Sequence, residues 1–169
     1  MQLPSIRQTN LVIFLGCCGL MAVGYFMQYM LGLEPCPLCM TQRVFIILTG
    51  VWALLAYLHS PALIGTRVYA FLVALSALIG GGFSMRQLHL QSLPAELAPT
   101  CGPSIDYMFE TFPFTKALEV MLKGDGNCAE VVWTFMGISI PGWTLVAFAG
   151  LFMLGLWQLL RGYKPVTVL

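Results

Sequence analysis

The sequence predicts an all-α integral membrane protein, a four-helix bundle with a long outer loop that carries short amphipathic surface helices. Of its 169 residues, 59% are hydrophobic and 9% are charged, and the mean hydropathy is +0.84. A soluble domain normally carries about 25% charged residues. Four long stretches are also free of charge, and a bilayer core needs roughly 20 helical residues. These observations argue against a soluble fold, and no basic cluster is present that would bind nucleic acid.

The charge-free stretches place the helices. They lie between Arg7 and Glu34, Arg43 and Arg67, Arg67 and Arg86, and Glu130 and Arg161. We therefore expect helices near residues 11–33, 41–58, 67–85 and 142–160, within one membrane domain that covers residues 1–169. On the third of them, small residues follow helical spacing and indicate close backbone packing: Ala70, Ala74, Ala77 and Gly81.

The distribution of charge predicts the orientation. Four spans put both termini and the short 59–66 turn on one side, which carries four basic residues and no acidic residue. All seven acidic residues fall in segments 34–43 and 86–141. Cytoplasmic segments of membrane proteins are enriched in Lys and Arg, so we expect cytoplasmic termini and an outer loop over 86–141.

Helical spacing also appears within the long outer loop. Two sets of apolar residues show it, Ile105, Met108, Phe109 and Phe112, followed by Phe114, Ala117, Leu118 and Met121. Pro113 separates the two sets, and charged residues lie between their members. The pattern predicts two short amphipathic helices on the surface of the lipid bilayer.

The cysteines fall into two groups. Cys17 and Cys18 lie inside the first predicted helix and are expected to pack as small apolar residues. The other four lie on the outer side: Cys36, Cys39, Cys101 and Cys128. A Cys-x-x-Cys pair, residues 36–39, opens the second helix, where Pro37 suits the first helical position and makes Cys36 the N-cap. Cys39 then lies in the first turn, where unpaired N–H groups and the helix dipole favour the thiolate that thiol–disulfide exchange requires.

Three further features bear on the chemistry. Arg43 lies on the same helical face as Cys39, where it would stabilise a thiolate or bind an acceptor oxygen, or else anchor the helix at the headgroups. Cys101 and Cys128, 27 residues apart, could form a structural disulfide or complete a zinc site with the Cys-x-x-Cys. Beside a redox-active pair, a relay of disulfides is the favoured interpretation. The stretch 124–127 before Cys128 contains two glycines and is expected to let this residue swing towards Cys36.

The electron acceptor is predicted by elimination. Oxidation of two thiols releases two electrons, and the sequence has no flavin or dinucleotide fingerprint and no Cys-x-x-Cys-His haem site. Its two histidines, His59 and His89, fall on opposite sides of the predicted membrane, which argues against a bis-histidine haem. A quinone that is reached from within the bilayer is the remaining simple acceptor.

Two segments carry a resemblance to a known family. They are Cys-Pro-Leu-Cys-Met-Thr-Gln-Arg (36–43) and Cys-Ala-Glu-Val-Val-Trp-Thr-Phe-Met-Gly-Ile-Ser-Ile-Pro-Gly-Trp (128–143). With Cys101 between them, the chain resembles the bacterial disulfide bond formation protein B (DsbB) family over nearly its whole length. The resemblance implies an inner-membrane enzyme that reoxidises a periplasmic thioredoxin-like oxidase of the DsbA type. The electrons would pass to the membrane quinone pool, as ubiquinone or menaquinone.

The same resemblance implies roles for individual residues. The partner's thiolate would attack Cys101, Cys128 would then exchange with Cys36, and Cys39 would be left as the thiolate that engages the quinone. Arg43 and His89, the latter placed just past the third helix, would lie near the quinone. For His89 the alternative is an interfacial histidine without a catalytic role.

Two other function classes remain open at this point. A quinone-epoxide reductase of the vitamin K type also uses four membrane helices and cysteine pairs, with electrons running the opposite way. In this sequence the Cys-x-x-Cys opens the second helix and precedes the loop pair, which favours the first class. A non-enzymatic membrane scaffold with one loop disulfide would leave Cys36, Cys39 and Arg43 without a purpose.

Overall fold

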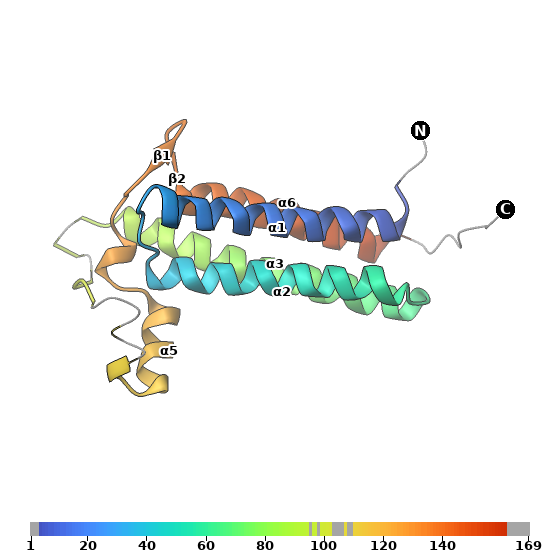
Figure 1. The fold of residues 1–169 in the computed structure, drawn as a ribbon, viewed down its shortest axis with the longest axis horizontal. Coiled ribbons are helices and arrows are strands. Elements are labelled where there is room, and N and C mark those ends of the chain that lie inside the picture. Colours follow the sequence, from blue (N-terminus) through green and yellow to red (C-terminus); the bar gives the residue numbers. More distant parts are fainter. Residues whose placement is uncertain (1–3, 95, 98, 103–106, 108–109, 162–169) are drawn as a thin grey trace.

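The computed structural model describes residues 4–94, 96–97, 99–102, 107 and 110–161. Its main elements are four long helices that lie side by side (Figure 1): α1 (Ile6–Met30), α2 (Pro37–His59), α3 (Leu63–Gln91) and α6 (Ile140–Leu160). Each is long and apolar enough to cross a membrane, which confirms the predicted four-helix architecture. The start of α1, the α2–α3 turn and the end of α6 lie at one end of the bundle, and the remaining elements lie at the other.

Most helix ends extend further into polar sequence than predicted, although α1 ends at Met30, three residues before its predicted end. Helix α1 begins at Ile6 rather than near residue 11, because Ser5 forms a capping box: its Oγ accepts from the Gln8 N–H at 3.2 Å, and Gln8 Oε1 accepts from the Ser5 N–H at 2.9 Å. Helix α3 continues to Gln91, six residues past the predicted end, so the charge at Arg86 does not terminate it. Charge-free stretches locate the apolar part of a helix, whereas capping groups set its ends.

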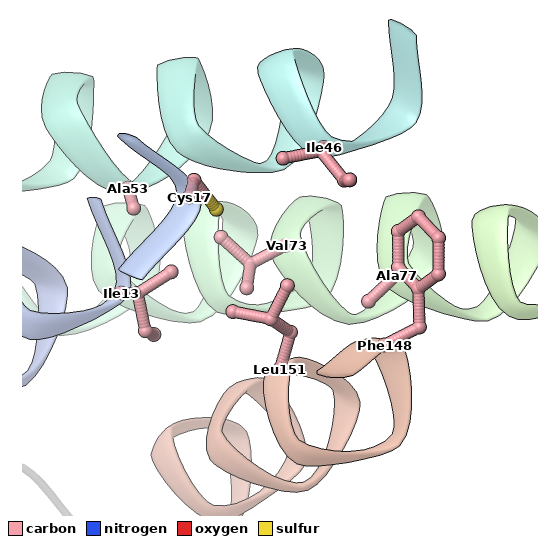
Figure 2. Close-up of a cluster of buried hydrophobic side chains, with 8 residues drawn as sticks. All are labelled: Ile13, Cys17, Ile46, Ala53, Val73, Ala77, Phe148 and Leu151. Atoms are coloured by element: carbon pink, nitrogen blue, oxygen red, sulfur yellow. The ribbon is translucent and has the colours of Figure 1, made fainter. Parts of the chain in front are cut away.

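Close packing joins α3 to α6 along the predicted seam of small residues, all of which are buried. A Cβ on Gly80 would lie 2.4 Å from the Phe148 ring, and one on Gly155 would lie 3.0 Å from the Ala74 backbone nitrogen. The core of the bundle (Figure 2) shares Ala77 with this seam and consists of Ile13, Cys17, Ile46, Ala53, Val73, Ala77, Phe148 and Leu151. Cys17 thus packs as a small apolar residue, as predicted, while Cys18 is exposed on the surface of α1.

Helix α5 (Phe114–Lys123) confirms the second predicted surface helix. It lies across the end of the bundle (Figure 1), with Phe114 and Leu118 exposed and Ala117 buried. Two hydrogen bonds fasten its last turn, from Thr41 Oγ1 to the Met121 carbonyl and from Arg86 Nε to the Lys123 carbonyl, both at 2.8 Å. For the first predicted surface helix, Ile105, Met108 and Phe109 lie outside the described residues.

A small hairpin before α6 was not predicted. Strands β1 (Thr134–Phe135) and β2 (Ile138–Ser139) pair antiparallel, and they protrude at the same end of the bundle as α5 (Figure 1). Both residues of the connecting turn have positive φ, 52° at Met136 and 79° at Gly137. This is the backbone of a type I′ turn, in which Asn usually takes the place that Met136 occupies here.

Candidate functional site

The Cys-x-x-Cys pair sits at the first turn of α2, as predicted. Cys36 is the N-cap, with an extended backbone, and its Sγ accepts from the Cys39 N–H at 3.4 Å. Pro37 occupies the first helical position, where a missing N–H costs no hydrogen bond. The Sγ atoms of Cys36 and Cys39 lie 2.9 Å apart, so a small shift would bring them to the bond length of a disulfide, about 2.0 Å.

The third cysteine at this site is Cys128, at the end of the short 3₁₀ helix η1 (Gly126–Cys128). It is fully buried and packs in one apolar cluster with Cys36, Leu38 and Leu90. The Cys36 thiol can donate its proton to the Cys128 sulfur or to the Cys39 sulfur, and these bonds and burial together raise the pKa of Cys36. The hydrogen bond from Cys36, helped by the N–H of Leu38, holds the pKa of Cys128 below its usual value. Cys36 therefore lies between two possible disulfide partners.

The two glycines before Cys128 allow close packing in this structure, and the swing expected from the sequence stays a prediction. A Cβ on Gly124 would lie 2.7 Å from Leu38 Cδ1, and the φ of Gly124 is +79°. A Cβ on Gly126 would lie 2.5 Å from the Pro99 carbonyl oxygen. Cys128 reaches Cys36 because this stretch lies flat against α2 and against the segment before Cys101.

Cys101 is exposed, and its segment is paired with the Cys128 segment through two hydrogen bonds. The Gly126 N–H donates to the Thr100 carbonyl at 3.1 Å, and Asn127 Nδ2 donates to the Gly102 carbonyl at 3.2 Å. The structure therefore holds the segments that carry Cys101 and Cys128 together although both cysteines are free thiols. The Cys101 thiol faces solvent, and the Cys128 thiol faces Cys36.

A cavity of about 480 Å³ lies beside the Cys-x-x-Cys pair. Cys36, Cys39 and Arg43 line its polar end, and the apolar walls come mainly from α1, from the hairpin and from α6. Helices α1 and α6 make few direct contacts with each other, and the cavity lies between them. Its lining includes the rings of Trp133, Phe135 and Trp143.

Arg43 faces this cavity but is bound to α1. Its Nη2 donates to the Gly24 carbonyl at 3.0 Å, its Nη1 donates to the Gln28 side-chain oxygen, and its guanidinium lies 5.3 Å from the centre of the Tyr25 ring. A guanidinium has five N–H donors. Two are used here by α1, which leaves donors for an acceptor in the cavity.

Two buried glutamines complete the site, and neither was predicted as a functional residue. Gln87 Nε2 donates to Cys36 Sγ at 3.2 Å and to Cys39 Sγ at 3.3 Å, and Gln42 Nε2 donates to Gln87 Oε1 at 2.8 Å. Gln87 lay beyond the predicted end of the third helix, and Gln42 was part of the quoted motif without a role. The seam of small residues on α3, continued past Gly81 at helical spacing, would have led to Ser84 and Gln87.

His89 is not brought to the cysteines. It lies within α3, rather than just past it, because the helix runs to Gln91. Its side chain is exposed, and it is not among the residues that line the cavity. Two residues along a helix turn the side chain by about 200°, so Gln87, and not His89, faces the sulfurs.

The fold and the site together define a class: a multi-pass membrane protein that gathers three cysteines beside an apolar cavity, with a fourth cysteine exposed nearby. Among the described residues, no group of His, Cys, Asp and Glu side chains could hold a metal ion. The family model for Disulfide bond formation protein DsbB matches residues 6–158. The chain therefore belongs to the disulfide bond formation protein B family.

Individual relatives agree with the family match. Disulfide bond formation protein B of Saccharophagus degradans is 54% identical over 95% of this chain and 96% of its own length. The protein of the same name from Marinobacter nauticus is 52% identical over 91% of this chain and 92% of its own length. The family assigns the chain to disulfide bond formation and to the oxidoreductases, which decides among the three function classes considered from the sequence.

Proposed function

We propose that this protein is a thiol oxidase that reoxidises a periplasmic thioredoxin-like dithiol of the DsbA type and transfers the electrons to ubiquinone or menaquinone. The observation that carries the proposal is the position of Cys36, whose sulfur lies 2.9 Å from that of Cys39 and which packs with Cys128 in one buried cluster. A cysteine between two possible disulfide partners is what a relay needs, because exchange proceeds by thiolate attack on a neighbouring disulfide sulfur.

The relay begins at the exposed cysteine. A thiolate of the partner attacks Cys101 in a Cys101–Cys128 disulfide, forms a mixed disulfide and releases Cys128 as a thiolate. A sulfur whose thiolate is stabilised leaves more readily, and the N–H of Leu38 favours the Cys128 thiolate without needing a proton on Cys36. Cys128 then attacks Cys36 in a Cys36–Cys39 disulfide and releases Cys39 as a thiolate.

The remaining steps restore both disulfides. The partner's second thiolate displaces Cys101, so the partner leaves as a disulfide, and Cys101 attacks Cys128 to release Cys36. Closing the Cys36–Cys39 bond then releases two electrons and two protons, which a bound quinone takes up to become quinol. The balance is one partner dithiol and one quinone converted into one partner disulfide and one quinol.

The residues around the cavity fit a quinone. Arg43 has donors left for a carbonyl oxygen, Cys39 lies at the same end, and aromatic and aliphatic side chains form the walls. The position of the cavity between α1 and α6 suits a molecule that enters from the bilayer. A water-filled channel would need polar walls, which most of this lining lacks.

The activity test uses the purified full-length protein in detergent, mixed anaerobically with a short-chain ubiquinone and a reduced thioredoxin-like dithiol. Quinone absorbance should fall in step with thiol loss. Cys39→Ser should still form an adduct with the dithiol protein yet fail to reduce quinone, while Cys101→Ser should form no adduct. Cys18→Ser, the same substitution at an exposed cysteine of α1, is the matched control. Thiol loss without any change in quinone would remove the quinone from the proposal.

We further propose that the protein lies in the bacterial inner membrane, with its termini in the cytoplasm. The end opposite the cysteines carries Arg7, stacked at 4.7 Å on Tyr57, and Arg161, stacked at 4.8 Å on Trp157. Such cation–aromatic pairs suit a headgroup region. In intact reduced cells, an impermeant maleimide should label Cys101 and spare Cys18. A cysteine placed at Ser60 should react only after permeabilisation, and labelling before it would reverse the topology.

A further inference from the structure

Two glutamine side chains from neighbouring helices meet beside the Cys-x-x-Cys pair. Gln42 on α2 and Gln87 on α3 are each 3% exposed. An amide in such a place is costly unless its polar atoms are hydrogen-bonded, all the more so near the apolar part of a membrane. The partners of these two amides therefore determine how they are oriented.

The hydrogen bonds assign each polar atom of Gln87. Its Oε1 accepts from Gln42 Nε2 at 2.8 Å and can also accept from the Cys39 thiol at 3.6 Å, so the bond from Gln42 identifies which end of the amide is the oxygen. An amide nitrogen carries two N–H groups. Two sulfurs lie within reach of it, Cys36 Sγ at 3.2 Å and Cys39 Sγ at 3.3 Å. One amide thus spans both atoms of the bond that the proposed reaction makes and breaks.

From this geometry we propose that Gln87 is a positioning residue that stabilises the reduced state of the Cys36–Cys39 pair, and that Gln42 holds it in the donor orientation. The inference depends on the proposed function, because it assumes that the pair cycles between disulfide and thiol. An N–H group binds an anionic sulfur more strongly than it binds a neutral disulfide sulfur. The pair of amides therefore favours the state that follows electron entry.

An amide suits this position better than a titratable side chain. It has no proton to give up over the physiological range, so it stabilises an anionic sulfur without protonating it. Gln91, one turn further along α3, shows the contrast: it also lines the cavity, yet its Oε1 accepts from Ser139 Oγ at 2.8 Å and its Nε2 donates to the Glu130 carbonyl at 3.4 Å. Proximity to the cavity alone does not produce the contact that Gln87 makes.

The test isolates the pair and measures its redox equilibrium. Full-length protein with Cys101→Ser and Cys128→Ser is purified free of quinone and equilibrated anaerobically in mixtures of reduced and oxidised dithiothreitol. The reductant supplies two electrons and two protons and becomes a cyclic disulfide. Maleimide quenching then gives the fraction of protein with a reduced Cys36–Cys39 pair.

Gln87→Met keeps the length of the side chain and removes its donors. It should lower the equilibrium constant for reduction about tenfold, which corresponds to about 1.4 kcal/mol. Gln87→Glu should lower it further, since a carboxylate repels a thiolate. Gln42→Met should have a smaller effect, about threefold, and none when Gln87→Met is already present, because Gln42 acts through Gln87. The matched control is Gln158→Met, which removes a buried amide from the far end of α6 and should leave the equilibrium unchanged.

Each outcome decides one question. A folded Gln87→Met protein with an unchanged equilibrium overturns the inference but leaves the relay intact. Equal effects of Gln42→Met with and without Gln87→Met would show that the two amides act independently, which contradicts the orienting role. A pair that neither forms nor loses a disulfide in any buffer contradicts the proposed function itself. If Gln87→Met fails to fold, as judged by its helical circular dichroism, Gln42→Met alone must show the shift.

Discussion

A single methyl group at Gly126 should separate the two segments that carry Cys101 and Cys128. In Gly126→Ala the new Cβ would lie 2.5 Å from the Pro99 carbonyl oxygen and 2.7 Å from the Cys101 nitrogen. Both are backbone atoms, so no flexible side chain can move aside. The strain also falls on the hydrogen bond from the Gly126 N–H to the Thr100 carbonyl. Overpacking of this kind costs about 1–3 kcal/mol, so closure of the Cys101–Cys128 disulfide should become about 5- to 140-fold less favourable.

The assay measures the effective concentration of the Cys101 thiol at Cys128, which sets how readily their disulfide forms. Protein with Cys36→Ser and Cys39→Ser is equilibrated in glutathione buffers, and the Cys101–Cys128 disulfide is quantified after alkylation. Gly82→Ala is the matched control, because nothing lies within 4 Å of its added Cβ. If Gly126→Ala folds and forms the loop disulfide as readily as the control, the close approach of Gly126 to the Pro99 carbonyl does not hold the two segments together.

Three further outcomes are expected. Cys128→Ser should accumulate an adduct through Cys101 on non-reducing gels when it is mixed with the oxidised partner, because the Cys101 thiolate attacks the partner's disulfide and no Cys128 thiol is present to attack the mixed disulfide in turn; an adduct that maps to Cys36 would make the loop pair structural. Arg43→Ala should raise the apparent KM for quinone about tenfold or more, the effect of losing a charged hydrogen bond, with adduct formation at Cys101 unchanged; unaltered quinone kinetics would remove Arg43 from the site. Cys36→Ala should shift the alkylation midpoint of Cys128 to higher pH, since the donor that lowers this pKa is lost; an equal or lower midpoint would refute the hydrogen bond.

The bundle could be predicted because the bilayer imposes one simple requirement, a long stretch without charge, and the sequence meets it four times. The start of α2 could also be predicted in detail, since Pro37 fixes the first helical position and thereby makes Cys36 the N-cap. The ends of α1 and α3 could not be located in this way. They depend on the capping box at Ser5 and on polar residues such as Gln87 that remain helical beyond the apolar stretch.

Contacts between distant parts of the chain were the main limit for the site. Spacing alone does not reveal that Cys128 lies beside Cys36, because that contact requires the whole fold. The two glycines before Cys128 show a related ambiguity: a glycine can supply freedom or allow close approach, and only the neighbouring atoms decide between them. The hairpin was missed for a different reason, since Met136 adopts a backbone conformation that its residue type seldom takes.

The two hydrogen bonds at the end of α5 have a kinetic consequence. They anchor the Met121 and Lys123 carbonyls to α2 and α3 only a few residues before Cys128. Without them, Cys128 would search for Cys36 from the end of a long tether, and its effective molarity there would fall with the length of the tether. With them, only the few residues between Lys123 and Cys128 act as the tether. Changes in the chain before α5 do not lengthen it. In the proposed relay, the partner-dependent step is then left to Cys101, whose surroundings can change without changing the distance over which Cys128 reaches Cys36.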